Sequence, residues 1–504
     1  MTVLEHPGIV AAASPDRLAV VFGETRMRYA ELDRWSSDAA ARLQAAGLEP
    51  GDTVALFAGN GCDFLAAAWA AQRSGLYLLP VPAQATTSEL AYLLADSGAR
   101  ALVHGDDQAA VAATTALQRW TLAEALAPCA APRAPAVEGG DMLYTSGTTG
   151  RPKGVKRALT LAPLGSETRR TARARLLFGL DRDSVLLSPA PLYHAAPLRF
   201  AMNLLRVGGT VVGLARFDAD AALAAIAAHR VTHSQWVPTM LARLLSLPAA
   251  LRAAYDLSTH RCAIHAGAPC PPHIKRAMIE WWGPILHEYY SGTESLGFTH
   301  VTSAEWLARP GTVGRACGCG LHVLGADGSE LGPDSTGTVY FSGTPGLAYH
   351  NAPEKTAAAH SAHGWATMGD VGHVDVDGYL FLTDRAAFTI ISGGVNVYPR
   401  EIEDALAALP GVADCAVFGV ADADRGEVVM AVVQPTAALP ATEAAATALL
   451  DALSHVLAPA KRPRFIAFET LARSETGKLD KATLRARWNS APGPRFAARA
   501  LRAA

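Results

Sequence analysis

Short apolar runs alternate with alanine-rich stretches over the first 105 residues of the chain. The runs Thr53–Phe57, Tyr77–Val81 and Ala101–His104 contain the residue types that favour strands. The alanine-rich stretches between them favour helices. Because strands that alternate with helices usually build a parallel sheet, this region predicts a layered α/β fold.

A second alternation of the same kind runs from Ser184 to about Tyr290. Strands are expected there near Val185–Ser188, Thr210–Leu214 and His260–Ala266. Residues 127–140, which precede it, are rich in proline, alanine and glycine and are interpreted as a surface connector.

The pattern changes beyond this second alternation. Glycine spacing and short strands over residues 313–343 predict a small antiparallel sheet or barrel, and a further strand is expected at Tyr379–Thr383. After Arg385 the pattern starts again with a turn, an amphipathic helix and a strand. We therefore expect a large N-terminal domain over residues 1–384, a hinge at 385–388 and a small α+β domain over 389–504.

Composition narrows the class of protein. A chain of 504 residues is too long for one ordinary core, and a net charge of -2 gives no support for nucleic-acid binding or for attraction to an anionic membrane. No apolar stretch reaches the length of a membrane span, and the first residues have no signal-type pattern. Seven scattered cysteines fit reduced thiols. These features predict a cytoplasmic protein.

The segment YTSGTTGRPKGV, residues 144–155, carries candidate chemistry. Its glycines let successive N–H groups point at one anion, its hydroxyls add donors, and its lysine adds charge. A Walker A loop would need glycine where Pro152 stands and Ser or Thr where Gly154 stands. The segment therefore predicts a phosphate loop of another type, formed by Thr145, Ser146, Gly147, Thr148, Thr149, Gly150 and Lys153.

This loop resembles that of the adenylate-forming superfamily, which contains acyl-CoA synthetases, peptide-synthetase adenylation domains and luciferases. Further motifs similar to those of the superfamily follow in the expected order over most of the chain. They are PLYHAAPL (191–198), HAGAPC (265–270), EYYSGTES (288–295), WATMGD (365–370), LTDR (382–385) and SETGKLDK (474–481).

The resemblance implies a role for individual residues of these motifs. It implies that Tyr290 stacks near adenine and that Asp370 accepts hydrogen bonds from both ribose hydroxyls, a task suited to a carboxylate. Lys478 would be the mobile catalytic lysine. The remaining implied nucleotide contacts are the loop Gly267, Ala268 and Pro269, the residues Glu288 and Tyr289, Thr293 at the α-phosphate, Glu294 as the Mg²⁺ ligand, and Arg385 at ribose and phosphate.

The implied reaction joins two anions, because a carboxylate attacks the α-phosphorus of ATP. Positive charge and oriented donors are therefore the main catalytic requirement. The acyl-AMP product is then attacked by the thiol of coenzyme A. In the superfamily the small domain rotates between the two steps, so Gly393 and Gly394 would let the pantetheine arm approach the backbone.

Two positions depart from the usual motifs. Ser291 stands where glycine is usual, which leaves the size of the acyl pocket open. The charged hinge pair is replaced by Ala386-Ala387-Phe388. A subgroup of fatty-acyl-CoA ligases is similar to this chain around ISGGVNVYP and HEYY and also has phenylalanine at the position of Phe388, which favours a fatty-acid-type ligase.

We therefore expect an acyl-CoA synthetase that activates a hydrophobic carboxylic acid, fatty or aromatic, with ATP, Mg²⁺ and coenzyme A. The acyl pocket is expected to be lined by His194, Trp236, Ala266, Gly267, Ser291, Gly292, Leu296 and Gly297, with His194 also counted among the catalytic residues.

Two alternatives remain. An adenylating enzyme that loads a carrier protein is hard to separate from an acyl-CoA synthetase by sequence. A nucleotide-binding regulatory protein is disfavoured because the motif residues are retained together. An amino acid substrate is disfavoured because residues 232–239 offer no acidic partner for its ammonium group. The particular acid and the oligomeric state, including a homodimer, stay open.

Overall fold

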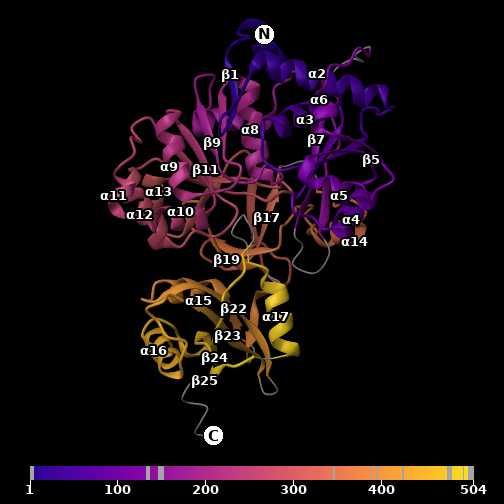
Figure 1. Ribbon diagram of the computed structural model, residues 1–504. Helices are drawn as coiled ribbons and strands as arrows, with labels where there is room; N and C mark the ends of the chain where they lie inside the picture. The colour runs from indigo at the N-terminus through magenta and orange to yellow at the C-terminus, as the bar shows by residue number, and fades with distance from the viewer. Residues whose placement is uncertain are drawn as a thin grey trace.

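A computed structural model describes most of the chain (Figure 1). The described residues are 5–131, 137–145, 152–343, 347–385, 388–392, 395–422, 425–473, 479–491 and 493–497. Two large sheets lie in the first three-quarters of the chain, and a third sheet lies in the last quarter.

The first sheet confirms the predicted parallel strands. Its order is β6-β5-β3-β4-β7-β8, and every pair is parallel except the last. The bounds are β3 Thr53–Phe57, β4 Tyr77–Val81, β5 Ala99–His104, β6 Gln118–Thr121, β7 Gly140–Thr145 and β8 Lys153–Lys156. β7 and β8 form the antiparallel hairpin that flanks the predicted phosphate loop.

The second sheet has a parallel half and an antiparallel half. In the parallel half, β13-β12-β11-β9-β10-β1 run side by side, and β2 closes the edge. The bounds are β1 Leu18–Phe22, β2 Thr25–Arg28, β9 Val185–Ser188, β10 Thr210–Gly213, β11 His233–Trp236, β12 Cys262–His265 and β13 Leu286–Tyr290. The strands expected in the second alternation are thereby confirmed.

Alternating side chains of these strands build a layered core. Val20 and Leu186 face one buried cluster, whereas their neighbours Val21 and Leu187 face another, as the period of two in a strand requires. The first cluster lies between the two sheets with α2 (Tyr29–Ala45), α3 (Cys62–Arg73), α7 (Arg169–Phe178) and α8 (Ala195–Val207). Outer helices cover the other faces: α4 (Thr87–Ser97) and α5 (Ala109–Ala112) on the first sheet, α9 (Ala219–Ala228), α10 (Pro238–Leu245) and α12 (Pro272–Trp282) on the second.

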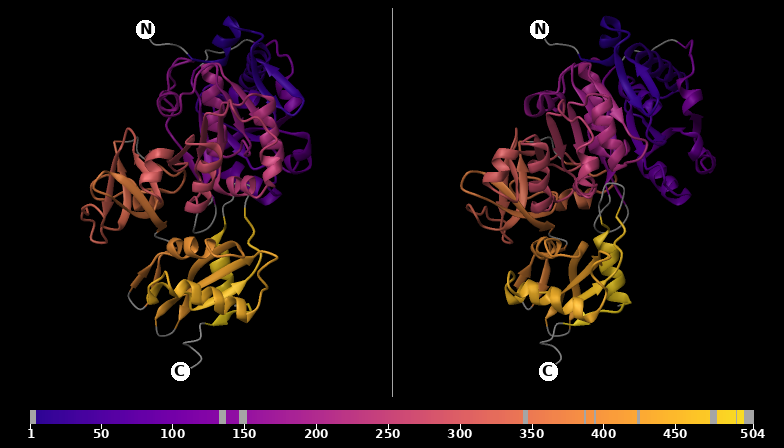
Figure 2. Two further views of the ribbon diagram at one scale, coloured as in Figure 1. Left: turned by 90° about the vertical axis from the view of Figure 1, so that its left-hand side faces the viewer. Right: turned by 60° about the vertical axis from the view of Figure 1, so that its left-hand side comes forward.

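The predicted antiparallel region is confirmed, and it continues the second sheet. β14 pairs with β13, and the order β14-β15-β19-β18-β17-β16 follows. The bounds are β14 Thr299–Thr302, β15 Thr312–Ala316, β16 Gly320–Leu324, β17 Gly337–Ser342, β18 Asp370–Val374 and β19 Tyr379–Arg385. Figure 2 shows this segment, in orange-pink, as a lobe beside the parallel layers.

The last quarter forms an α+β unit of its own, which lies below the other layers in Figure 1. Its sheet has the order β21-β20-β23-β24-β25, with β22 on β23, and is covered by α15 and α16 on one face and α17 on the other. The bounds are β20 Ile390–Ser392, β21 Val395–Val397, α15 Pro399–Ala407, β22 Val412–Asp422, β23 Gly426–Pro435, α16 Glu443–Ser454, β24 Phe465–Phe468, α17 Lys481–Ser490 and β25 Phe496–Ala497. The boundaries at 384 and 389 stay a prediction.

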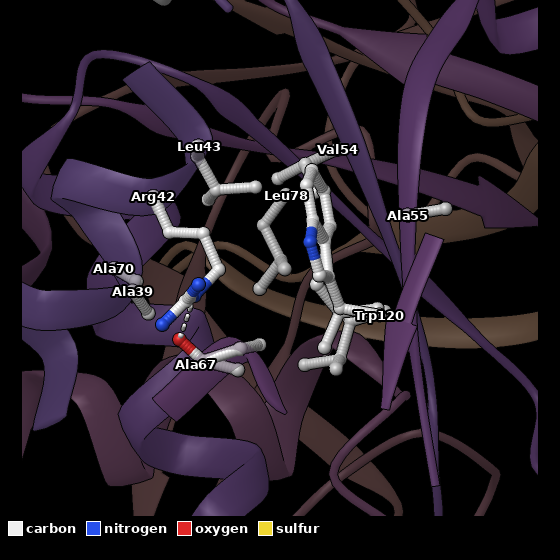
Figure 3. A pocket seen from close by; sticks show the side chains of 12 residues that line it. Ala39, Arg42, Leu43, Val54, Ala55, Ala67, Ala70, Leu78 and Trp120 are labelled. Carbon is white, nitrogen blue, oxygen red and sulfur yellow. Dashed lines mark hydrogen bonds between the residues drawn. The ribbon is translucent and has the colours of Figure 1, made fainter. Parts of the chain in front are cut away.

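A small apolar pocket lies inside the first layers (Figure 3). Arg42 and Trp120 lie on opposite sides of it, and the Nε of Arg42 donates to the carbonyl of Ala125 at 3.4 Å. None of its lining residues belongs to a predicted site.

Among the helices of the described ranges, none combines the length and the apolar character that crossing a bilayer requires. All seven cysteines are free thiols, as predicted.

Candidate active site

Four parallel strands of the second sheet end at one edge, where most of the predicted site residues follow them. β9 leads toward His194, β11 ends at Trp236, β12 leads to the 266–269 turn and β13 leads to the 291–297 loop. Because the carboxyl ends of neighbouring parallel strands meet at one edge, the fold brings these segments together. Ligands of open α/β sheets bind at such an edge.

The turn after β12 contains a glycine in a left-handed conformation. Gly267 has φ +90°, a left-handed conformation that glycine adopts without a Cβ clash. Gly267 and Pro269 are exposed, whereas Ala266 is buried and donates its N–H to the carbonyl of Trp236 at 3.3 Å. The turn therefore presents backbone at the sheet edge, as its predicted contact with adenine requires.

Tyr290 and Asp370 are in direct contact although 80 residues separate them in sequence. The Tyr290 hydroxyl donates to Oδ2 of Asp370 at 2.5 Å, and Asp370 is only 8% exposed. Asp370 begins β18 and pairs in register with Arg385 on β19. Asp370 and Arg385, two predicted nucleotide-binding residues, thus lie on adjacent strands of the antiparallel half, and Asp370 contacts the end of β13.

The other two predicted residues of β13 lie inside the protein. Glu288 is 6% exposed and pairs with the fully buried Lys275 at 2.5 Å. Burial alone would raise the pKa of Glu288, but Lys275 and His265 outweigh it and hold that pKa below its ordinary value. Tyr289 is 9% exposed and stacks on Phe298 at 5.0 Å between centroids. The structure therefore gives no support to side-chain contacts between these two residues and a nucleotide.

The loop after β13 is closed by the unusual serine. The Ser291 hydroxyl donates to the carbonyl of Gly297 at 2.6 Å. A Cβ on Gly297 would lie 2.1 Å from the buried ring of Phe341, and one on Gly292 would lie 2.3 Å from Sδ of Met368. Both glycines thus allow the loop to pack closely against the antiparallel strands, and Leu296 beside them is fully buried.

Glu294 and Lys153 both contact Tyr349, a residue that the motifs did not indicate. The Tyr349 hydroxyl donates to Oε1 of Glu294 at 3.1 Å, and the Nζ of Lys153 lies 5.3 Å from the centroid of the Tyr349 ring. Burial is the main cause that lowers the pKa of Lys153. Lys153 begins β8 and is the register partner of Thr145 on β7. The end of the phosphate-loop hairpin therefore lies beside the predicted metal ligand.

His194 and Trp236 occupy different surroundings. His194 is half-buried at the N-cap of α8, with its ring 4.4 Å from that of Tyr193. The Trp236 ring is fully buried, donates to Ser234 at 2.5 Å and packs against Trp282. Trp236 therefore belongs to the core under the outer helices, and its predicted contact with the acyl group has no support from this placement.

Part of the predicted site falls outside the described residues. This holds for Ser146, Gly147, Thr148, Thr149 and Gly150 of the phosphate loop, for Gly393 and Gly394, and for Lys478. Thr145 and Arg385 lie in strands, but their side chains are outside the description.

The motifs also did not indicate a charged cluster beside the Thr293–Ser295 turn, formed by Arg199, Asp141 and Arg157. Arg199 of α8 forms a bidentate ion pair with Asp141 of β7, at 2.8 Å and 2.9 Å. Arg199 and Arg157 also donate to carbonyls of the turn. A signal did exist in the sequence, because Asp141 lies in a strand and Arg199 lies between Leu198 and Phe200 in an apolar helix face. Charges at buried positions require partners.

This fold and this set of residues at one sheet edge define an adenylate-forming enzyme, a class in which a large α/β unit is followed by a small α+β unit. A family model described as "AMP-binding enzyme" matches residues 9–348, and one described as "AMP-binding enzyme C-terminal domain" matches residues 401–478. The chain belongs to the AMP-binding enzyme family. The class predicted from the motifs is thereby confirmed.

Similar proteins cover nearly the whole chain. A feruloyl-CoA synthase from an Amycolatopsis species is 34% identical over 488 residues, covering 95% of this chain and 97% of its own. The long-chain-fatty-acid–CoA ligase FadD13 of Mycobacterium tuberculosis is 32% identical over 507 residues, with the same coverage. The crystal structure of ATP-bound MatB from Rhodopseudomonas palustris superposes with a TM-score of 0.82 at 28% identity, covering 98% of this chain and all of that one.

Proposed function

We propose that this chain is an AMP-forming acyl-CoA synthetase that activates a hydrophobic carboxylic acid with ATP and transfers the acyl group to coenzyme A. The observation that carries the proposal is the contact between Tyr290 and Asp370 next to the turn that holds Thr293 and Glu294. With these assignments the proposed nucleoside contacts and the proposed phosphate contacts lie at one edge of the sheet, and the proposal is supported by membership of the AMP-binding enzyme family.

The nucleoside is held by the residues at the ends of β12, β13 and β18. Asp370 accepts hydrogen bonds from the ribose hydroxyls, and the hydrogen bond that the Tyr290 hydroxyl donates keeps the Asp370 carboxylate in place. The exposed turn at Gly267 packs against adenine with backbone atoms. Thr293 donates its hydroxyl to the α-phosphate, while Lys153 and the loop before it hold the outer phosphates.

Glu294 fits a Mg²⁺ ion that arrives with ATP. Its Oε1 accepts from the neutral hydroxyl of Tyr349, and within the described ranges no lysine or arginine forms an ion pair with it. No cluster of three or more candidate ligands exists among the described residues. Mg²⁺ prefers one or two protein carboxylates together with phosphates and water, so a single carboxylate at the phosphate site suits it. When bound, the ion would neutralise phosphate charge.

The chemistry is two displacements. A carboxylate oxygen of the acid attacks the α-phosphorus of ATP, the bond to the β,γ-phosphates breaks, and pyrophosphate leaves with the electron pair. The sulfur of coenzyme A then attacks the acyl carbon, the thiol proton is released, and AMP leaves. Lys478 and Thr293 stabilise charge in the first displacement, and His194 lies on the acyl side. No enzyme nucleophile is required.

The two steps use different faces of the C-terminal unit. We assign residues 385–388 as the hinge and Gly393 and Gly394 as the point where the pantetheine arm passes in the second step. β20 and β21 flank these glycines and expose Ile391 and Val395. A rotation about the hinge would exchange the loop of Lys478 for this hairpin.

The substrate class rests on the predicted pocket and on the names of relatives. The pocket residues other than the buried Trp236 are small or apolar apart from His194 and Ser291, and relatives are named for a long-chain fatty acid and for ferulate. A cytoplasmic location stays a prediction.

The test is a substrate panel. The purified chain is incubated with ATP, Mg²⁺, coenzyme A and fatty, aromatic or branched acids, and acyl-CoA is measured by chromatography with mass detection. We expect thioester from one class of hydrophobic acid. Pyrophosphate release without thioester would instead favour transfer to a carrier protein, and the absence of both products with every acid would contradict the proposal.

A further inference from the structure

The turn Thr293–Ser295, which carries the proposed phosphate and metal contacts, is held through its backbone by two arginines. The carbonyl of Thr293 accepts from both terminal nitrogens of Arg199, each at 3.3 Å. The carbonyls of Glu294 and Ser295 both accept from Nη2 of Arg157 at 2.7 Å. Three successive carbonyls are therefore engaged by two guanidinium groups.

Arg199 is itself fixed by a carboxylate. Its Nε and Nη2 donate to the two oxygens of Asp141, and both side chains are only 14% exposed. A bidentate pair of this kind fixes the plane of the guanidinium as well as its position. Arg170 donates to the same carboxylate at 3.0 Å, but it has no contact with the turn among the described interactions.

The turn has a conformation that needs support. Ser295 has φ +49°, in the left-handed region that non-glycine residues rarely adopt. Such conformations persist when the surroundings determine them, and they concentrate at functional sites. The Ser295 hydroxyl accepts from Nη1 of Arg199 at 3.2 Å, which ties the side chain of the strained residue to the same guanidinium.

The carboxylate of Glu294 is oriented separately. The Oε1 of Glu294 accepts from the hydroxyl of Tyr349, which is 55 residues away in sequence. The backbone carbonyl of Glu294 accepts from Arg157. Backbone and side chain of Glu294 are thus held by different partners. Pre-oriented contacts of this kind lower the cost of ordering a site when its ligand arrives.

We propose that Arg199 and Arg157 are positioning residues for MgATP, acting through the carbonyls of the Thr293–Ser295 turn, and that Asp141 sets the orientation of Arg199. The proposal rests on the proposed function only in naming MgATP as the ligand of this turn. Arg199 and Arg157 contact the turn and not the reacting atoms, so their effect reaches the nucleotide through Thr293 and Glu294.

The test compares Arg199→Lys with Arg170→Lys. Lysine keeps the charge at each position but cannot form the bidentate pair and reach a carbonyl at once. Both variants lose a contact with Asp141, and only Arg199→Lys also loses contacts with the turn. Binding of ATP is measured by calorimetry without any acid substrate, once with Mg²⁺ and once with EDTA, and thermal unfolding verifies that each variant folds.

We expect Arg199→Lys to weaken MgATP binding about tenfold, the effect of losing one charge-assisted hydrogen bond. Binding in EDTA should change less, because the Glu294 contact needs Mg²⁺ whereas the Thr293 contact with the α-phosphate does not. Arg170→Lys should stay within about twofold of wild type under both conditions. Arg157→Lys, which disrupts no ion pair among the described residues, is expected to behave like Arg199→Lys and serves if the latter does not fold.

Equal effects of the Arg199 and Arg170 variants on MgATP binding would overturn the positioning role. The proposed function fails on a different result. A wild-type chain that binds MgATP but forms no thioester would contradict the synthetase and leave this comparison readable. A wild-type chain that binds no MgATP would overturn both.

Discussion

At the scale of single residues, the proposed nucleotide binding rests first on the contact between Tyr290 and Asp370. Tyr290→Phe removes the hydroxyl that donates to Asp370 at 2.5 Å while keeping the ring. We expect the KM for ATP to rise about tenfold, because a hydrogen bond to a charged group is lost, while the KM for the acid changes little. Steady-state kinetics with each substrate varied in turn measures both.

A matched control exists outside the site. Tyr379 donates its hydroxyl to Oε1 of Glu305 at 3.0 Å, so Tyr379→Phe loses a bond of the same kind. That variant should unfold at a lower temperature with an unchanged KM for ATP. If both variants raised the KM for ATP alike, the Tyr290–Asp370 contact would have no special role in nucleotide binding.

At the scale of secondary-structure elements, a buried ion pair joins helix α12 to strand β13. Lys275 is fully buried and contacts Glu288 at 2.5 Å. Lys275→Met leaves the Glu288 carboxylate buried without its partner, which costs about 3–5 kcal/mol of unfolding free energy near pH 7. Lys461→Met breaks the exposed pair with Glu401 and should cost about 1 kcal/mol or less. Denaturant unfolding monitored by fluorescence measures both.

The same pair predicts the pH dependence of stability. The pKa of Glu288 in the folded protein lies below its ordinary value of 4.5, because Lys275 and His265 outweigh burial. The pair therefore contributes stability that is fully present above the unfolded pKa and is lost as the pH falls through the folded pKa. Without Lys275, burial should raise the pKa of Glu288, so the deficit of Lys275→Met should shrink between pH 7 and about pH 4. A deficit independent of pH would contradict this account.

The sequence predicts a helix or strand well where the residues of that segment alone decide its structure. Thr53–Phe57 and Tyr77–Val81 are strands with those bounds because their residue types and flanking helices decide locally. The pairing of β14 with β13, which joins the antiparallel strands to the parallel sheet, depends on contacts between distant segments and leaves no local pattern. The same reason hides Tyr349 and the Asp141–Arg199 pair, whose partners lie 55 or more residues away.

At the scale of the whole molecule, we propose that one reaction is divided between two units. The large unit would hold the nucleotide at the sheet edge, and the C-terminal unit would contribute Lys478 to the first displacement only. Lys478→Ala should abolish formation of acyl-AMP while sparing thioester formation from supplied acyl-AMP. Separate assays of the two steps measure this, and equal loss of both steps would remove Lys478 from the proposed role.

Motifs predict the units of this molecule better than the details of its site. The order of motifs along the chain identifies the family. The side chains of Glu288, Tyr289 and Trp236 could not be placed in this way. Their burial depends on helix α12 and on aromatic neighbours such as Trp282 and Phe298, which pack against them from other elements.

The identity of the intermediate distinguishes an adenylate-forming enzyme from other ATP-dependent ligases. The chain is incubated with ATP, Mg²⁺ and a substrate acid without coenzyme A, quenched, and analysed by mass spectrometry; coenzyme A is then added to a parallel sample. We expect acyl-AMP and pyrophosphate first, followed by conversion of the acyl-AMP into equal amounts of acyl-CoA and AMP. Formation of ADP and phosphate in place of AMP and pyrophosphate, or thioester that forms without acyl-AMP, would contradict an adenylate-forming enzyme.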